Sequence, residues 1–128
     1  MSYTIDRLIT GATLDEVDAR ARAAMAAIGF GVLTEIDMKA TLKEKIGAEI
    51  PPYRILGACN PQMAHQAIGM ESRVGVMLPC NVILRAVDGG VAVSTIDPTV
   101  TMQVIDNEGL HALAAQGRDL LVRAFAAI

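Results

Sequence analysis

The spacing of hydrophobic positions in the first part of the chain predicts a strand followed by an amphipathic helix. Apolar and polar residues alternate loosely over residues 3–9, which is typical of a half-buried strand. Thr13 then stands three residues before Glu16, which is the pattern of a capping box at a helix N-terminus. Gly29 can end this helix. Its apolar stripe has helical spacing and consists of Leu14, Val17, Ala21, Ala24 and Ile28.

The middle of the chain predicts two further strands, each followed by a helix. Residues 30–36 and 53–58 are rich in apolar side chains and are expected to be strands. Asp37 can cap a helix that ends at Gly47. The pair at 60–61 is Asn-Pro, a sharp helix start, because asparagine is a good N-cap and proline has no N–H to lose at the first helical position.

The last part of the chain predicts antiparallel strands and a closing helix. Residues 74–78 and 82–87 are expected to be strands on either side of a proline. The Asp-Gly-Gly sequence at 88–90 is typical of a hairpin, with a return strand over 91–96. A final helix is expected to start near 106–107. Its apolar stripe is Leu110, Leu113, Ala114, Gly117, Leu121, Ala124 and Ile128.

These elements together predict one α+β domain over residues 1–128, in the order β-α-β-α-β-α-β-β-β-α. A doubly wound parallel sheet would alternate strands and helices to the end, whereas the hairpin at 88–90 breaks that alternation. We therefore expect a mixed, largely antiparallel sheet with the helices packed mainly on one face. Each long helix has a single apolar stripe, and this stripe should face the sheet.

Composition and charge exclude some classes of binding partner but do not indicate a reaction. Hydrophobic residues make up 52% of the 128 residues, so the chain can bury enough apolar surface to fold. A net charge of −3 and 3% aromatic residues argue against nucleic-acid binding. No apolar run has the ~20 residues of a membrane span and no leader pattern begins the chain, so we expect a cytoplasmic protein with reduced thiols and no membrane partner. Exposed apolar surface on so small a domain favours a homodimer over an alanine-rich monomer.

Two cysteines, each followed by an asparagine, are the main candidates for chemistry. Cys59 and Asn60 lie between an expected strand and a helix N-terminus, where the helix dipole favours a thiolate. Cys80 and Asn81 lie beside a proline in the strand region. A structural role is the stronger explanation for each cysteine taken singly, because free cysteine often fills apolar cores.

A soft-metal site is a more specific hypothesis for the same residues. Thiolate, imidazole and thioether donors suit Cu(I) or zinc, and the chain offers Cys59, Cys80 and His65, with Met63 or Met77. The spacing matches no recognised metal pattern, and a partly exposed position on a helix also explains the histidine.

Other chemical motifs are sparse. The helix after Asp37 carries Lys39, Lys43 and Lys45, a basic face that could bind an anion or could simply be solvated. Neither a glycine-rich phosphate loop nor a GxSxG nucleophile elbow occurs in the sequence. A classical hydrolase is therefore not expected.

Four segments form a specific combination: GFGVLTEIDMKATLKEKIG from Gly29, YRILGACNP from Tyr53, LPCNV from Leu78 and TIDP from Thr95. Together they resemble the domain-of-unknown-function family 302 over nearly the whole chain. The resemblance implies a small α+β homodimer with a fold similar to the TATA-box-binding-protein class, and no established activity. A shared fold would not carry DNA binding with it. The family motifs correspond to Phe30, Asp37, Lys43, Gly57, Cys59, Asn60, Pro61, Leu78, Pro79, Cys80, Asn81, Asp97 and Pro98.

We therefore expect a homodimeric domain that binds a small ligand or a soft metal ion. Its ligand-binding residues are expected to be Cys59, Asn60, Cys80, Asn81 and Lys43, with the asparagines supplying amide contacts. The first alternative is a cysteine-thiolate enzyme of sulfur or redox chemistry. The second is a structural or interaction module with both cysteines packed in the core and no cleft. The sequence names no cofactor.

Overall fold

Five strands and five α-helices make up residues 2–128, the part of the chain that this computed structural model describes. The strands are β1 (Thr4–Thr10), β2 (Gly31–Asp37), β3 (Tyr53–Cys59), β4 (Cys80–Val87) and β5 (Gly90–Ile96). The helices are α1 (Leu14–Ala27), α2 (Met38–Ile46), α3 (Pro61–Met70), α4 (Pro98–Thr101) and α5 (Glu108–Ala126). Two short 3₁₀ helices, η1 (Val74–Met77) and η2 (Met102–Val104), lie between them.

Local side-chain caps fix the helix starts that the sequence predicts. In each case the capping side chain accepts a hydrogen bond from a backbone N–H in the first turn, which satisfies a donor that has no partner within the helix. The pairs are Thr13 with Glu16, Asp37 with Ala40, Asn60 with Met63, and Asn107 with Leu110. The Thr13 capping box is complete in both directions.

The five strands form one open sheet in the order β1-β5-β4-β3-β2, and each of these pairings is antiparallel. The α+β class is confirmed, and the sheet is antiparallel throughout rather than mixed. The predicted hairpin joins β4 to β5, with Gly89 in the left-handed region at φ 80°.

The strand expected over 74–78 is wrong, because η1 occupies that segment as a short 3₁₀ helix. Val74 is buried and Val76 is 89% exposed, so the first side chain packs inside the protein and the second faces solvent. A short apolar run is compatible with a buried strand and with a buried helical turn. The next strand, β4, begins only at Cys80, after Pro79.

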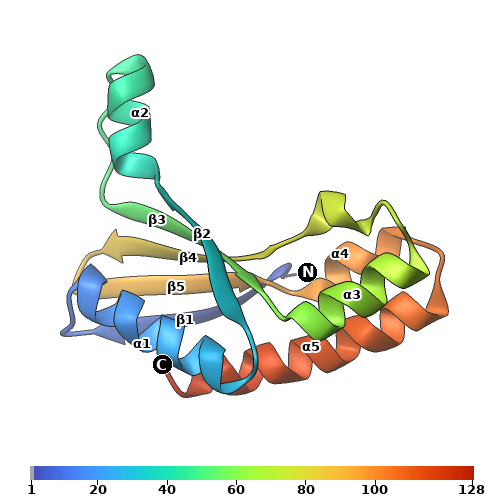
Figure 1. Ribbon diagram of the computed structural model, residues 1–128. Helices are drawn as coiled ribbons and strands as arrows, with labels where there is room; N and C mark the ends of the chain where they lie inside the picture. The colour runs from blue at the N-terminus through green and yellow to red at the C-terminus, as the bar shows by residue number, and fades with distance from the viewer. Residues whose placement is uncertain (1) are drawn as a thin grey trace.

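The helices cover one face of the sheet, as the sequence predicts. α1 and α5 lie beneath the strands, and α3 and α4 continue that layer beyond the end of the sheet (Figure 1). The main core lies between the sheet and the helices α1 and α5 and includes Val17, Met25, Leu56, Val82, Leu84, Val91, Val93, Leu121 and Phe125. A second, smaller core forms where α3, α5 and the 3₁₀ helices meet and consists of Ala67, Val74, Met102, Leu110, Leu113 and Ala114.

α2 is the exception to this layering. It stands away from the sheet on the side opposite α1 and α5 (Figure 1), and none of its nine residues is buried. Within residues 2–128, no helix combines the length and apolar character that crossing a bilayer would need.

Candidate functional site

The end of β3 and the start of α3 position Cys59. Asn60, the next residue, is the N-cap of α3, and its side-chain oxygen accepts a hydrogen bond from the Met63 backbone N–H at 3.1 Å. Pro61 occupies the first turn of the helix. The cysteine is thereby held at the point where the chain leaves the sheet and enters the helical layer.

Cys80 is the first residue of β4 and lies beside Cys59 across the strand pair. In the antiparallel register Cys80 is the partner of Ala58, the residue before Cys59. The two cysteines therefore lie at the same end of adjacent strands. Both are free thiols, and both are half-buried.

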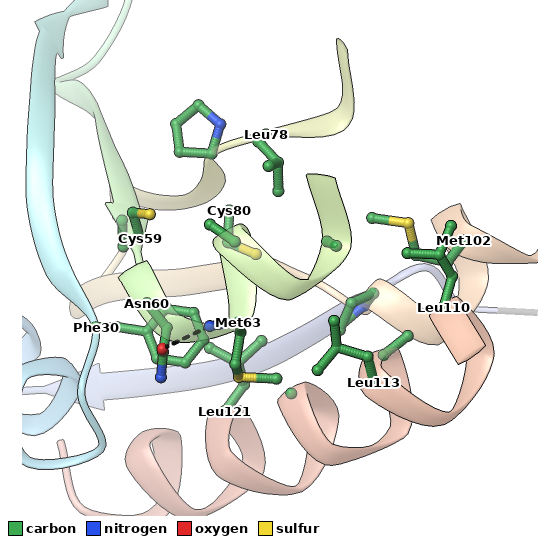
Figure 2. A pocket seen from close by; sticks show the side chains of 17 residues that line it. Phe30, Cys59, Asn60, Met63, Leu78, Cys80, Met102, Leu110, Leu113 and Leu121 are labelled. Atoms are coloured by element: carbon green, nitrogen blue, oxygen red, sulfur yellow. Dashed lines mark hydrogen bonds between the residues drawn. The ribbon is translucent and has the colours of Figure 1, made fainter. Parts of the chain in front are cut away.

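A cavity of about 70 Å³ lies between this end of the sheet and the helices α3 and α5. Figure 2 shows Cys59 and Cys80 toward one end of it and Met102 and Leu110 toward the other. The residues that line it are Phe30, Ala58, Cys59, Asn60, Met63, Ala64, Ala67, Leu78, Pro79, Cys80, Pro98, Met102, Leu110, Leu113, Ala114, Gly117 and Leu121.

The surroundings of Cys80 keep its thiol protonated at neutral pH. Burial raises the pKa of Cys80 to about 11, and the neighbouring Cys59 adds to that increase. An apolar environment disfavours a thiolate because the charge loses its hydration. Cys80 is therefore a neutral thiol, which does not suit it to act as a nucleophile near pH 7.

Three of the expected site residues lie outside this cavity. Asn81 follows Cys80 in β4, so its side chain lies on the opposite face of the sheet, where it lines an outer groove. Lys43 lies on α2 and forms an ion pair with Glu49 at 3.2 Å. His65 is exposed on α3 and does not line the cavity.

The three-residue metal site expected from Cys59, Cys80 and His65 is not assembled. No group of three or more histidine, cysteine, aspartate or glutamate residues in 2–128 could hold a metal ion. The structure brings together the two thiols alone, because His65 lies on the exposed side of α3.

The walls of the cavity include residues that the sequence pattern assigned only to the core. Leu110, Leu113, Ala114, Gly117 and Leu121 form part of the predicted apolar stripe of α5, and they line the cavity over about three turns. The sequence feature that could indicate a cavity here is the presence of alanine and glycine in that stripe, since these small residues leave space that a leucine would fill. A Cβ on Gly117 would contact the Met63 methyl group at 3.3 Å.

The buried Asp97 holds the far wall of the cavity in place. Its carboxylate accepts hydrogen bonds from the Thr99 N–H and hydroxyl at 3.0 and 2.6 Å and from the Arg118 guanidinium at 3.0 Å. Burial alone would raise the pKa of Asp97, but these hydrogen bonds lower it below its ordinary value. The carboxylate thus links the start of α4, which contributes Pro98 to the lining, to α5.

An outer groove of about 250 Å³ lies on the opposite side of the same sheet end. It is lined by Tyr3, Thr4, Met77, Pro79, Asn81, Ile83, Ser94, Thr95 and Ile96. Pro79 lines both this groove and the inner cavity.

Comparisons with known proteins agree with the resemblance of the four segments. The family described as domain of unknown function DUF302 matches residues 7–128. A solved structure of an uncharacterized conserved DUF302 protein from Bacillus stearothermophilus has the same fold, with a TM-score of 0.91 and 24% identity over 99% of this chain and 98% of that chain. No curated protein matches the sequence. The chain belongs to the DUF302 family.

Proposed function

We propose that this domain binds a small apolar ligand in the cavity between the sheet and helices α3 and α5, as part of a homodimer. The observation that carries the proposal is the lining of the cavity. Apart from the two thiols, Asn60 is the polar side chain among the seventeen lining residues, and its oxygen already caps α3. A charged or strongly polar ligand would lose its hydration there without gaining partners.

The shape of the cavity favours a slender ligand. Its wall along α5 runs from Leu110 to Leu121, which is about 16 Å at the rise of an α-helix. A volume of about 70 Å³ over such a length describes a narrow slot with room for a few water-sized groups. Met63 and Met102 line it, and their flexible thioethers can adjust to an occupant.

The same features weaken both alternatives. For a cysteine-thiolate enzyme, the raised pKa of Cys80 keeps that thiol neutral, so the hypothesis depends on Cys59 alone. The interaction module expects no cleft, whereas a cavity is present and both cysteines line it. Ligand binding is the function that the site supports best.

A series of straight-chain alcohols tests the proposal. Affinity should increase about fourfold for each added CH₂, because burying one is worth about 0.8 kcal/mol, until the slot is filled. The measurement is a titration followed by the NMR signals of the methionine methyl groups. Those of Met63 and Met102 should shift, while that of Met38 on α2, outside the cavity, should not.

A matched pair of alanines provides the control. Ala114 lines the cavity and the adjacent Ala115 is exposed on the same helix. Ala114→Leu should abolish alcohol binding by filling the slot, and Ala115→Leu should leave it unchanged. The proposal is wrong if no alcohol binds saturably, or if Ala114→Leu binds as tightly as the wild-type protein.

A soft metal ion is the second candidate, favoured by the two neighbouring thiols. Thiolates select Cu(I), and without further ligands zinc is a poor fit, since its sites use three or four protein donors. Binding would release the proton of each thiol. Anaerobic titration with Cu(I) against a chromophoric chelator should give one ion per chain, and Cys59→Ser with Cys80→Ser should abolish it. If the doubly substituted protein competes with the chelator for Cu(I) as well as the wild-type protein does, this candidate is ruled out.

A further inference from the structure

The face of the sheet turned away from α1 and α5, here called the open face, carries several apolar side chains among polar ones. Side chains alternate along a strand, so residues between the buried core positions lie on this face. One row crosses all five strands and consists of Asp6, Ser94, Ile83, Ile55 and Ile36. A second consists of Leu8, Ala92, Arg85 and Tyr53.

No α-helix covers these rows within residues 2–128, although Met77 of η1 and Pro79 lie beside Ile83 and Ser94 where the rows meet the outer groove. Leu8 is 58% exposed and Ile36 is 43% exposed. The face of an antiparallel sheet that meets water normally carries polar side chains. Exposed apolar side chains gathered on one face are typical of a surface that meets a partner.

The helix α2, here called the arm, has the same lack of cover. It has nine residues, none of them buried, and Ile46 at its end is 73% exposed. An isolated helix shorter than about 12 residues is marginal in water, and helices in proteins gain most of their stability from packing. The arm therefore needs a surface to pack against beyond the strands β2 and β3 that carry it.

The arm and the open face lie on the same side of the sheet (Figure 1) and carry complementary charges. The arm rises from one end of the open face, on the same side of the sheet (Figure 1). Asp6 and Arg85 on the face and Glu44 and Lys45 on the arm form no ion pair within residues 2–128. Each surface thus has one negative and one positive side chain that could pair with the opposite charges of the other surface.

The combined area is sufficient for a stable dimer. Five strands of about seven residues give the open face about 550 Å², from ordinary strand spacing and rise. A standard interface buries about 800 Å² on each partner. The arm, about 14 Å long and about 10 Å wide, adds about 140 Å², which brings the total to about 690 Å². That total lies within the roughly 600–1,000 Å² per partner that standard interfaces span.

We propose that a second copy of this chain covers the open face, with the arm of each protomer lying across the open face of its partner. This is a two-fold arrangement in which each chain contributes both halves of the contact. It gives the proposed homodimer its surface. It is independent of cavity binding, since the cavity lies on the other side of the sheet.

Sedimentation of the full chain over a range of concentrations tests the surface. The wild-type protein should be a dimer. Leu8→Glu on the face and Ile46→Glu on the arm should each raise the dissociation constant more than tenfold, because each buries an unpaired charge. Val104→Glu is the matched control, since Val104 is 76% exposed on η2, outside both surfaces, and the dimer should persist.

Circular dichroism melting and alcohol titration of the same variants separate the possible failures. If the Leu8→Glu or Ile46→Glu variant is a monomer that melts cooperatively and still binds alcohol, the substitution has removed the interface without unfolding the domain, as the proposal predicts. A wild-type monomer at micromolar concentrations overturns the proposal, as does a dimer that tolerates both substitutions. Loss of alcohol binding with an intact dimer would count only against the cavity.

Discussion

At the scale of single residues, adjacent positions serve opposite sides of the molecule. Cys80 lines the inner cavity and Asn81 lines the outer groove, because successive side chains in a strand alternate between faces. The repeated Cys-Asn pair suggested one site to which all four residues contribute. Strand alternation separates the second pair, whereas Cys59 and Asn60 stay together because the chain turns into α3 between them.

The raised pKa of Cys80 makes stability depend on pH in the alkaline range. The folded pKa is about 11 against an ordinary value of 9.0, so the folded state keeps its proton after the unfolded state has lost it. The associated stability is complete below pH 9 and is lost as pH rises toward 11. The free energy of unfolding should fall by up to about 1.4 kcal/mol per pH unit in this window.

Urea denaturation of the wild-type protein and Cys80→Ala at several pH values measures this effect. The variant lacks the thiol, so its profile shows only the background from other groups. The difference between the two free energies of unfolding should change across the window from pH 9 to 11. Parallel profiles would show that the thiol ionises alike in both states.

At the scale of elements, β3 is where several parts of the fold converge. It pairs with β2 and β4 and ends at Cys59, so its packing sets the position of the cavity. Gly57 allows this, because a Cβ there would overlap the Thr34 hydroxyl and would lie 2.8 Å from the Pro79 Cγ atom. The glycine is required by close approach, not by a turn.

Gly57→Ala should therefore destabilise the protein by about 1–3 kcal/mol, the usual effect of overpacking. Gly31→Ala is the control, since Gly31 lies on β2 with open space around its Cα. It should change stability by less than about 0.5 kcal/mol. Thermal or urea unfolding measures both variants, and equal effects would contradict the role given to Gly57.

Elements that depend on neighbouring residues were predictable, and those that depend on distant ones were not. Thr13, Asp37, Asn60 and Asn107 each cap a helix within three residues, so the sequence contains the whole interaction. Sheet membership depends on partner strands far along the chain, which is why the apolar run at 74–78 predicts a strand although η1 occupies it.

At the scale of the whole molecule, the α+β architecture follows from the hairpin and the single-sided apolar stripes. The proximity of the two cysteines was also predictable, since both were placed at strand ends. The cavity was not, because a helical stripe does not distinguish residues that touch the sheet from those that leave a gap beneath it. The position of Lys43 depends on the arm standing away from the sheet, which no local pattern encodes.

Pro79 separates two hollows of the molecule, because it lines both the inner cavity and the outer groove. A substitution at this position therefore alters both walls at once, so a variant of Pro79 cannot test either hollow by itself.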